Sequence, residues 1–248
     1  MRAHELVNSI YGLGKFYYKE SNGRVLGILS AHVRRHIDLY SLDQLSQVLS
    51  SLSRVGVVNA PLLSDIVRKL LSRELDVKTC SSRNLVNLMV SFARFGVRPS
   101  RKIQVWEYLA NEIVFRSSDI TVSDRIAAIY AYSIMHVSSP HIDLFQACVN
   151  TNDDVLLLSP SDVCKYIYAC SRVQYRDLEF LALFADSIRE NIGKFTNEQI
   201  RKLYVDLDKL GIEVKEISQL QTVPLDSTPQ TTWYPQRVPT RQFKKVSS

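Results

Sequence analysis

One thirteen-residue pattern occurs twice in the chain at an interval of 40 residues. Residues 45–57 read LSQVLSSLSRVGV, and residues 85–97 read LVNLMVSFARFGV. Both begin with Leu, carry Ser at the seventh place and Arg at the tenth, and end in Gly-Val. Sequences that repeat at such an interval are typical of helical solenoids, in which each repeat packs against the one before it.

The same pattern can be aligned at six places along the chain. The six segments begin at Leu6, Leu45, Leu85, Ile126, Val163 and Ile200. The repeat length therefore lies between 37 and 41 residues. Within a segment the first, fourth or fifth and eighth places are mostly apolar, which is the spacing of an amphipathic helix. The seventh and ninth places are often small, as at Gly12 and Gly14, and this predicts close contact with a neighbouring helix.

Residues that begin and end helices occur at the edges of these segments. Ser41 with Gln44, and Thr196 with Gln199, have the spacing of a capping box. We place two further N-caps at Ser123 and Ser161. Three glycines follow a segment at the place where a left-handed residue ends a helix, namely Gly56, Gly96 and Gly211.

A second pattern of helical period lies between successive segments. It covers residues 24–37, 61–75, 101–116, 140–150 and 178–191. Each repeat is therefore expected to be an antiparallel pair of helices. The sequence predicts an all-α protein, an α-solenoid of about five to six helix-turn-helix repeats over residues 1–217.

Residues 218–248 differ from the repeats in composition. Four prolines interrupt this segment, and no helical period is visible in it. Its basic residues are Arg237, Arg241, Lys244 and Lys245, and its aromatic residues are Trp233, Tyr234 and Phe243. The segment is either a disordered tail or an extended arm that becomes ordered on a partner, with the aromatic residues as anchors and the basic residues on RNA.

Composition narrows the possible functions. The formal net charge is +6 and the isoelectric point about 9.1, which permits an acidic partner without requiring one. The four cysteines are scattered, which favours a reducing compartment. No apolar run approaches the roughly 18–20 residues of a membrane span. The chain has no P-loop, G-x-G-x-x-G or G-x-S-x-G motif. We therefore expect no enzyme activity, catalytic residue, cofactor, metal or small-molecule substrate.

The tenth place of the six segments is mostly basic. It holds Lys15, Arg54, Arg94, Met135, Arg172 and Lys209. One explanation is that a cation in the last turn of a helix interacts favourably with the negative end of the helix dipole. The other is a row of cations along one side of the solenoid that contacts successive RNA phosphates, interrupted by Met135.

Tyrosines are frequent in the fourth to sixth segments. They are Tyr130, Tyr132, Tyr166, Tyr168 and Tyr204. Aromatic rings at these positions could stack on RNA bases, but packing within the solenoid is the preferred interpretation.

The motif L-x-x-L-x-x-S-x-A/S-R-x-G-V with this period resembles the heptatricopeptide-type helical repeats of organellar RAP and FAST-kinase-like proteins. The resemblance is best at residues 45–57 and 85–97, looser at 163–175 and 200–212, and covers residues 5–217. It implies RNA association and residence in the mitochondrial matrix, with the plastid as the second alternative. Such proteins often end in a RAP domain, and residues 218–248 are too short and too rich in proline to form one.

A basic helical repeat followed by a basic arm is typical of a structural subunit of a large particle. The resemblance therefore suggests a non-catalytic, RNA-binding subunit of a mitochondrial ribonucleoprotein, with the mitochondrial ribosome and its rRNA as the first choice. Its partners would be RNA and neighbouring protein subunits. The alternative is a protein–protein scaffold subunit of a respiratory or ATP synthase complex.

Overall fold

The computed structural model describes residues 2–16, 19–98, 103–135, 142–147, 155 and 158–212 of the 248-residue chain. Within these residues the structure has eleven α-helices, four 3-10 turns and no strand. Neighbouring helices contact one another as in an α-solenoid, so the predicted fold class is confirmed. Residues 218–248 lie outside the described part of the chain.

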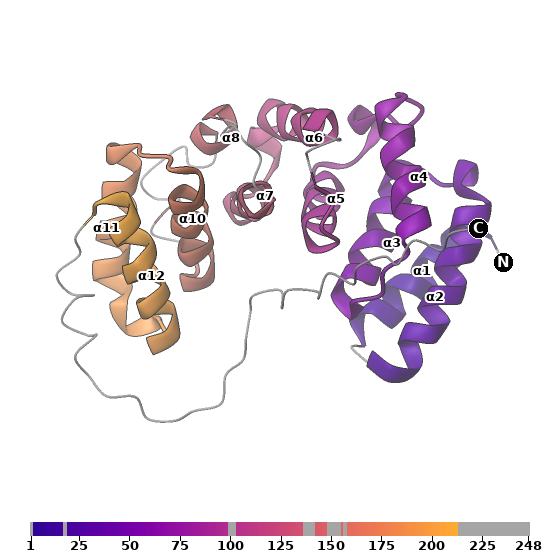
Figure 1. The fold of residues 1–248 in the computed structure, drawn as a ribbon, viewed down its shortest axis with the longest axis horizontal. Coiled ribbons are helices and arrows are strands. Elements are labelled where there is room, and N and C mark those ends of the chain that lie inside the picture. Colours follow the sequence, from indigo (N-terminus) through magenta and orange to yellow (C-terminus); the bar gives the residue numbers. More distant parts are fainter. Residues whose placement is uncertain are drawn as a thin grey trace, which may run out of the picture.

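Helices of two kinds alternate along the chain and form two layers. The inner helices, each in contact with the next one, are α1 (Ala3–Lys15), α3 (Leu42–Val55), α5 (Ser82–Arg94), α7 (Val122–Ile134), α10 (Pro160–Val173) and α12 (Asn197–Leu210). The outer helices are α2 (Lys19–Arg35), α4 (Ala60–Leu71), α6 (Ile103–Phe115), α8 (Ile142–Gln146) and α11 (Leu178–Asn191). In Figure 1 the stack curves into an arch, with α5 and α7 on its inner side and α6 and α8 above them on the outer side.

Each helix pair has one inner helix, and the N-cap of that helix marks the start of the repeat. These N-caps are Arg2, Ser41, Ser81, Thr121, Ser159 and Thr196, at steps of 39, 40, 40, 38 and 37 residues. The capping boxes predicted at Ser41 and Thr196 are confirmed. The N-caps predicted at Ser123 and Ser161 are wrong, because both helices begin two residues earlier. The Thr121 hydroxyl already accepts the backbone N–H of Asp124.

This register also corrects the alignment of the fourth repeat. The first place of the motif lies four residues after the N-cap, and in α7 that residue is Arg125 rather than Ile126. The equivalent residues of the other inner helices are buried Leu, Val or Ile. Arg125 is itself only 5% exposed, and its Nη1 donates to the carbonyl oxygen of Ala147 just after α8 over 2.7 Å. Its aliphatic stem takes the place of the usual leucine.

Left-handed residues end four of the inner helices. Gly56, Gly96 and Gly211 have φ values of 77°, 68° and 73°, as predicted, and Gln174 has the same conformation with φ of 56°. The next residue then donates its N–H back to the helix, as from Val97 to the Phe92 carbonyl over 2.9 Å. This is the Schellman arrangement, and it directs the chain into the following outer helix.

Polar bonds between inner helices fix each repeat on the next. Asp43 of α3 accepts hydrogen bonds of 2.9 Å at Oδ1 from the backbone N–H and hydroxyl of Ser81 and from Nδ2 of Asn84. Burial opposes ionisation of Asp43, but these bonds outweigh it and the pKa of this carboxyl is lowered. The Ser171 hydroxyl similarly donates to Asp206 Oδ1 of α12 over 3.1 Å. These bonds keep consecutive inner helices in the same register.

Glycine is required at one helix contact, which gives a prediction with an internal control. A Cβ on Gly14 would lie 2.7 Å from the Ser51 Cβ and 2.9 Å from the Ser51 Cα, whereas a Cβ on Gly12 meets nothing within 4 Å. Gly14→Ala is expected to push α1 away from α3 and cost about 1–3 kcal/mol of unfolding free energy. Gly12→Ala is expected to stabilise the same helix by up to about 1 kcal/mol.

Urea unfolding of the two glycine variants beside the wild type measures both effects. Equal midpoints for Gly12→Ala and Gly14→Ala would show that α1 and α3 are not in close contact.

The side of α12 that faces away from α10 differs from the surfaces between repeats. The positions five, eight and twelve residues after the N-cap, which are small or apolar in the preceding inner helices, are Arg201, Tyr204 and Asp208 here. All three are exposed. Polar residues at these positions suit a terminal repeat that faces water.

Candidate nucleic-acid interface

The predicted basic residues of the repeats occupy one structural position. Each lies 13 residues after the N-cap, in the last turn of an inner helix. They are Lys15, Arg54, Arg94, Arg172 and Lys209, and we call them the cationic row. Because consecutive inner helices contact one another in the same register, these side chains lie along one side of the solenoid. Arg54 is half-buried, and the other four are exposed.

The exposed side of each inner helix is opposite its outer helix. In α3 to α12 the residues 6, 9 and 13 positions after the N-cap are mostly accessible, whereas those 4 and 11 positions after it are almost all buried. We call the accessible positions the inner face, since they lie on the side of each inner helix that is turned away from the buried positions and the outer helix. The cationic row forms one edge of this face.

Tyr11 joins the first two members of the cationic row. Lys15 Nζ lies 4.8 Å from the centre of the Tyr11 ring. A hydrogen bond with Lys15, the charge of Lys15 and a weaker contribution from Arg54 lower the pKa of the Tyr11 hydroxyl. Two cations from successive repeats therefore converge on one exposed hydroxyl, an arrangement that suits an anion.

Arg94 and Lys209 differ in their surroundings. Arg94 Nη1 donates to the Ser53 hydroxyl of α3 over 3.5 Å, which again links one repeat to the one before it. Lys209 forms an ion pair of 2.8 Å with Asp206, which is buried. The charge of Lys209 is therefore partly compensated within the protein.

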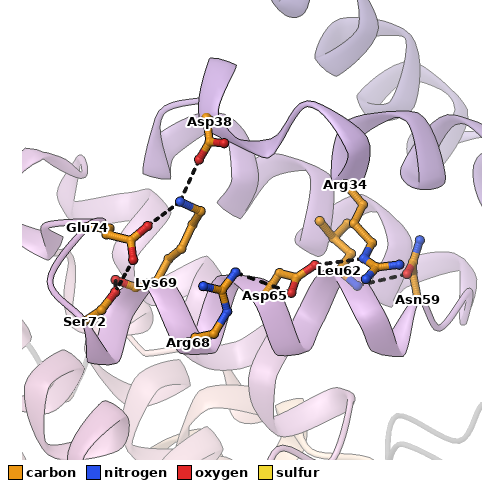
Figure 2. Close-up of polar contacts among 9 residues, drawn as sticks. All are labelled: Arg34, Asp38, Asn59, Leu62, Asp65, Arg68, Lys69, Ser72 and Glu74. Carbon is orange, nitrogen blue, oxygen red and sulfur yellow. Dashed lines mark hydrogen bonds and ion pairs between the residues drawn. The ribbon is translucent and has the colours of Figure 1, made fainter.

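The outer helices also carry basic residues near their ends, but several of these pair with carboxylates. Arg34 lies 2.8 Å from Asp65, and Arg68 lies 3.7 Å from the same carboxylate (Figure 2). Lys69 lies between Asp38 and Glu74, at 2.6 and 2.5 Å. A basic residue in the last turn is thus common to both layers, as the helix-dipole explanation requires. Regular placement along the inner face is what distinguishes the cationic row.

The interruption of the cationic row is confirmed, but the residue is different. The tenth place of the fourth repeat is Ile134, because the register of that repeat moves by one residue. Met135 is the C-cap of α7 and is 8% exposed. The repeat pattern predicted Met135 at the tenth place because an apolar residue was expected at the first place, where the chain has Arg125.

The tyrosines separate into two groups. Tyr132 and Tyr166 are buried and belong to the core, and Tyr166 stacks on Phe184 with ring centres 4.3 Å apart. Tyr130 and Tyr168 lie on the inner face, half-buried, with ring centres 5.4 Å apart. Tyr204 lies in the middle of α12 and is 36% exposed. The packing interpretation is confirmed for Tyr132 and Tyr166, and the rings of Tyr130 and Tyr168 also pack against each other.

Two basic residues of the inner face were missed from the sequence. Lys165 and Lys202 lie six residues after the N-caps of α10 and α12. Each pairs with a carboxylate of its own helix, Lys165 with Asp162 over 2.8 Å and Lys202 with Glu198. Their common distance from the N-cap was the available signal, but the equivalent positions of α3, α5 and α7 are uncharged.

The basic and aromatic residues predicted to bind partners in the tail lie outside the described residues. They are Arg237, Arg241, Lys244, Lys245, Trp233, Tyr234 and Phe243. In the part of the chain that the structure describes, no helix combines the length and apolar character needed to cross a bilayer. Over the same residues, no three His, Cys, Asp or Glu side chains form a group able to hold a metal ion.

The fold and the cationic row define the chain as a basic α-solenoid. No model of a known protein family matches it, and a search of curated proteins finds no similar sequence.

Proposed function

We propose that this protein is a non-catalytic helical-repeat subunit that binds RNA along its inner face. The observation that carries the proposal is the cationic row, in which Arg54, Arg94 and Arg172 occupy one position of a repeated structure. Helix packing distances of 8–10 Å place successive members roughly 10 Å apart. Cations at regular intervals suit a polyanion whose charges also recur at regular intervals, and such contacts are independent of base sequence.

The proposed setting is a mitochondrial ribonucleoprotein, with the ribosome and its rRNA as the first choice. This part of the proposal rests on the resemblance of the repeat motif to organellar RNA-binding repeats. Recovery of the tagged protein from mitochondria together with rRNA and ribosomal proteins is the expected result.

The salt dependence of RNA binding tests the use of the cationic row. For single-stranded RNA, the logarithm of the association constant falls with the logarithm of the salt concentration by about 0.7 for each phosphate neutralised. If most of the row is used, we expect a slope of about −3 or steeper, measured by fluorescence anisotropy over a salt series. A slope near zero would rule out a phosphate-binding surface.

A second candidate function, a protein–protein scaffold, is favoured by a groove on the outer side. The groove has a volume of about 720 Å³ and lies between α8 and residues 174–179, which join α10 to α11 and begin α11. Ile142 and Leu178 line it and are 52% and 71% exposed. Apolar side chains exposed at a groove suit a protein partner. Recovery with respiratory or ATP synthase subunits and without RNA would favour this candidate.

A further inference from the structure

The inner face changes character at α7. At the positions 6, 9 and 13 residues after the N-cap, α7 has Ala127, Tyr130 and Ile134. The other five inner helices have a basic residue at the last of these positions. With Tyr168 of α10, whose ring lies 5.4 Å from that of Tyr130, these three residues form a patch that we call the apolar patch.

Two basic residues flank the apolar patch. Arg94 of α5 precedes it and Arg172 of α10 follows it, and both are exposed. Arg94 and Tyr130 come from α5 and α7, which are consecutive inner helices in contact. Burial raises the pKa of the Tyr130 hydroxyl, and a tyrosine hydroxyl is neutral at physiological pH even at its ordinary pKa. The patch is thus an uncharged, partly aromatic surface between two cations that are two repeats apart, roughly 20 Å.

A single strand and a duplex would meet this surface differently. In a duplex the bases are paired and stacked inside, so an apolar surface would face charged phosphates and remove water from them without replacing the lost hydrogen bonds. In a single strand the bases can turn toward the protein and stack on tyrosine rings, while the phosphates on either side reach the cations.

We propose that the apolar patch binds unpaired bases, so that the RNA is single-stranded where it crosses α7. This inference rests on the proposed RNA-binding function and specifies its substrate. A protein partner could also cover an apolar patch, but the exposed arginines on both sides match the phosphate–base–phosphate order of a nucleic acid strand.

The test measures binding of the full chain to an unstructured, fluorescein-labelled RNA strand and to a duplex of the same length. The variant Tyr130→Leu/Tyr168→Leu removes both rings and keeps an apolar surface. Because stacking of one base on one aromatic side chain changes affinity roughly tenfold, we expect about a tenfold or greater loss for the single strand. The salt slope should not change, since no charge is removed.

Two control variants and an abasic strand separate stacking from a general disturbance of the fold. Tyr130→Phe/Tyr168→Phe keeps both rings and should bind the single strand as the wild type does. Tyr204→Leu removes a tyrosine of α12 that is 36% exposed, and it should also leave binding of the single strand unchanged. An abasic strand of the same length, tested on the wild-type protein, should bind about as weakly as the normal strand binds the Leu variant. This last measurement does not depend on how any variant folds.

Several results would overturn the inference. They are equal affinity of the wild type for duplex and single strand, full binding of the abasic strand, or an equal loss in the Phe and Leu variants. If reversal of the cationic row still abolishes binding in those cases, the RNA-binding function stands and only the base contact is wrong. If the wild type binds neither RNA, the function and the inference both fail.

Discussion

Reversing three charges of the cationic row is expected to lower RNA affinity roughly a hundredfold. In Arg54→Glu/Arg94→Glu/Arg172→Glu, each change removes an attraction to a phosphate that is worth about 1 kcal/mol at 4 Å in water, and three such losses correspond to roughly a hundredfold in affinity. The salt slope should become shallower by about 2, since three phosphate contacts are lost. Anisotropy titrations over a salt series measure both quantities.

The outer helices provide a matched control for this variant. Arg35, Arg68 and Arg189 also lie in the last turns of their helices, α2, α4 and α11. Their reversal to Glu gives the same net charge of zero, starting from +6. It also carries the same helix-dipole cost of about 0.3–1 kcal/mol for each helix. We expect this control to keep most of the RNA affinity. Equal losses in the two triple variants would mean that total charge governs binding and the row has no special role.

Removal of Trp106 is expected to be the most destabilising single change. Its side chain is fully buried in α6, its Nε1 donates to the Val97 carbonyl oxygen over 3.0 Å, and its ring meets Tyr132 edge-on at 6.2 Å. It therefore joins α6 to α7 and to the segment that follows α5. Trp106→Ala leaves a large cavity and an unpaired carbonyl, and we expect a loss of about 3–5 kcal/mol. That is a large part of the roughly 5–15 kcal/mol that holds a typical domain together.

The replacement Trp106→Phe keeps most of the ring and loses the hydrogen bond, so a smaller loss of about 1–2 kcal/mol is expected. Urea unfolding measures both variants. Because each repeat contacts only its neighbours, hydrogen exchange in Trp106→Ala should rise first in α5 to α7 and later in α1 and α12. Uniform exchange along the chain would show that the solenoid unfolds as a single unit.

The sequence predicted the layers of the fold well because the signals are local. The capping boxes at Ser41 and Thr196 involve residues three positions apart, and the left-handed glycines need no tertiary contact. The same reasoning fails where a position that usually requires one residue type holds a different one. Gln174 ends α10 in the left-handed conformation without being glycine, and its position gave no warning of this.

The candidate interface was predicted in part. The common position of the cationic row followed from the repeat. The apolar patch did not, because the register error at Arg125 placed Met135 instead of Ile134 at the tenth place of the fourth repeat. That error arose from tertiary structure, since Arg125 can occupy a leucine position only where the end of the short helix α8 offers the Ala147 carbonyl. Whether Tyr130 or Tyr132 faces outward likewise depends on this one-residue shift.

The charged residues on the side of α12 that faces away from α10 limit how the array of repeats can be lengthened. A helix pair joined after α12 would have to dehydrate Arg201 and Asp208, whereas a copy of residues 81–120 inserted after residue 120 would meet the same neighbours that this unit already has. An engineered protein with a wider span should therefore be built by internal duplication, with each added unit extending the inner surface by one further arginine.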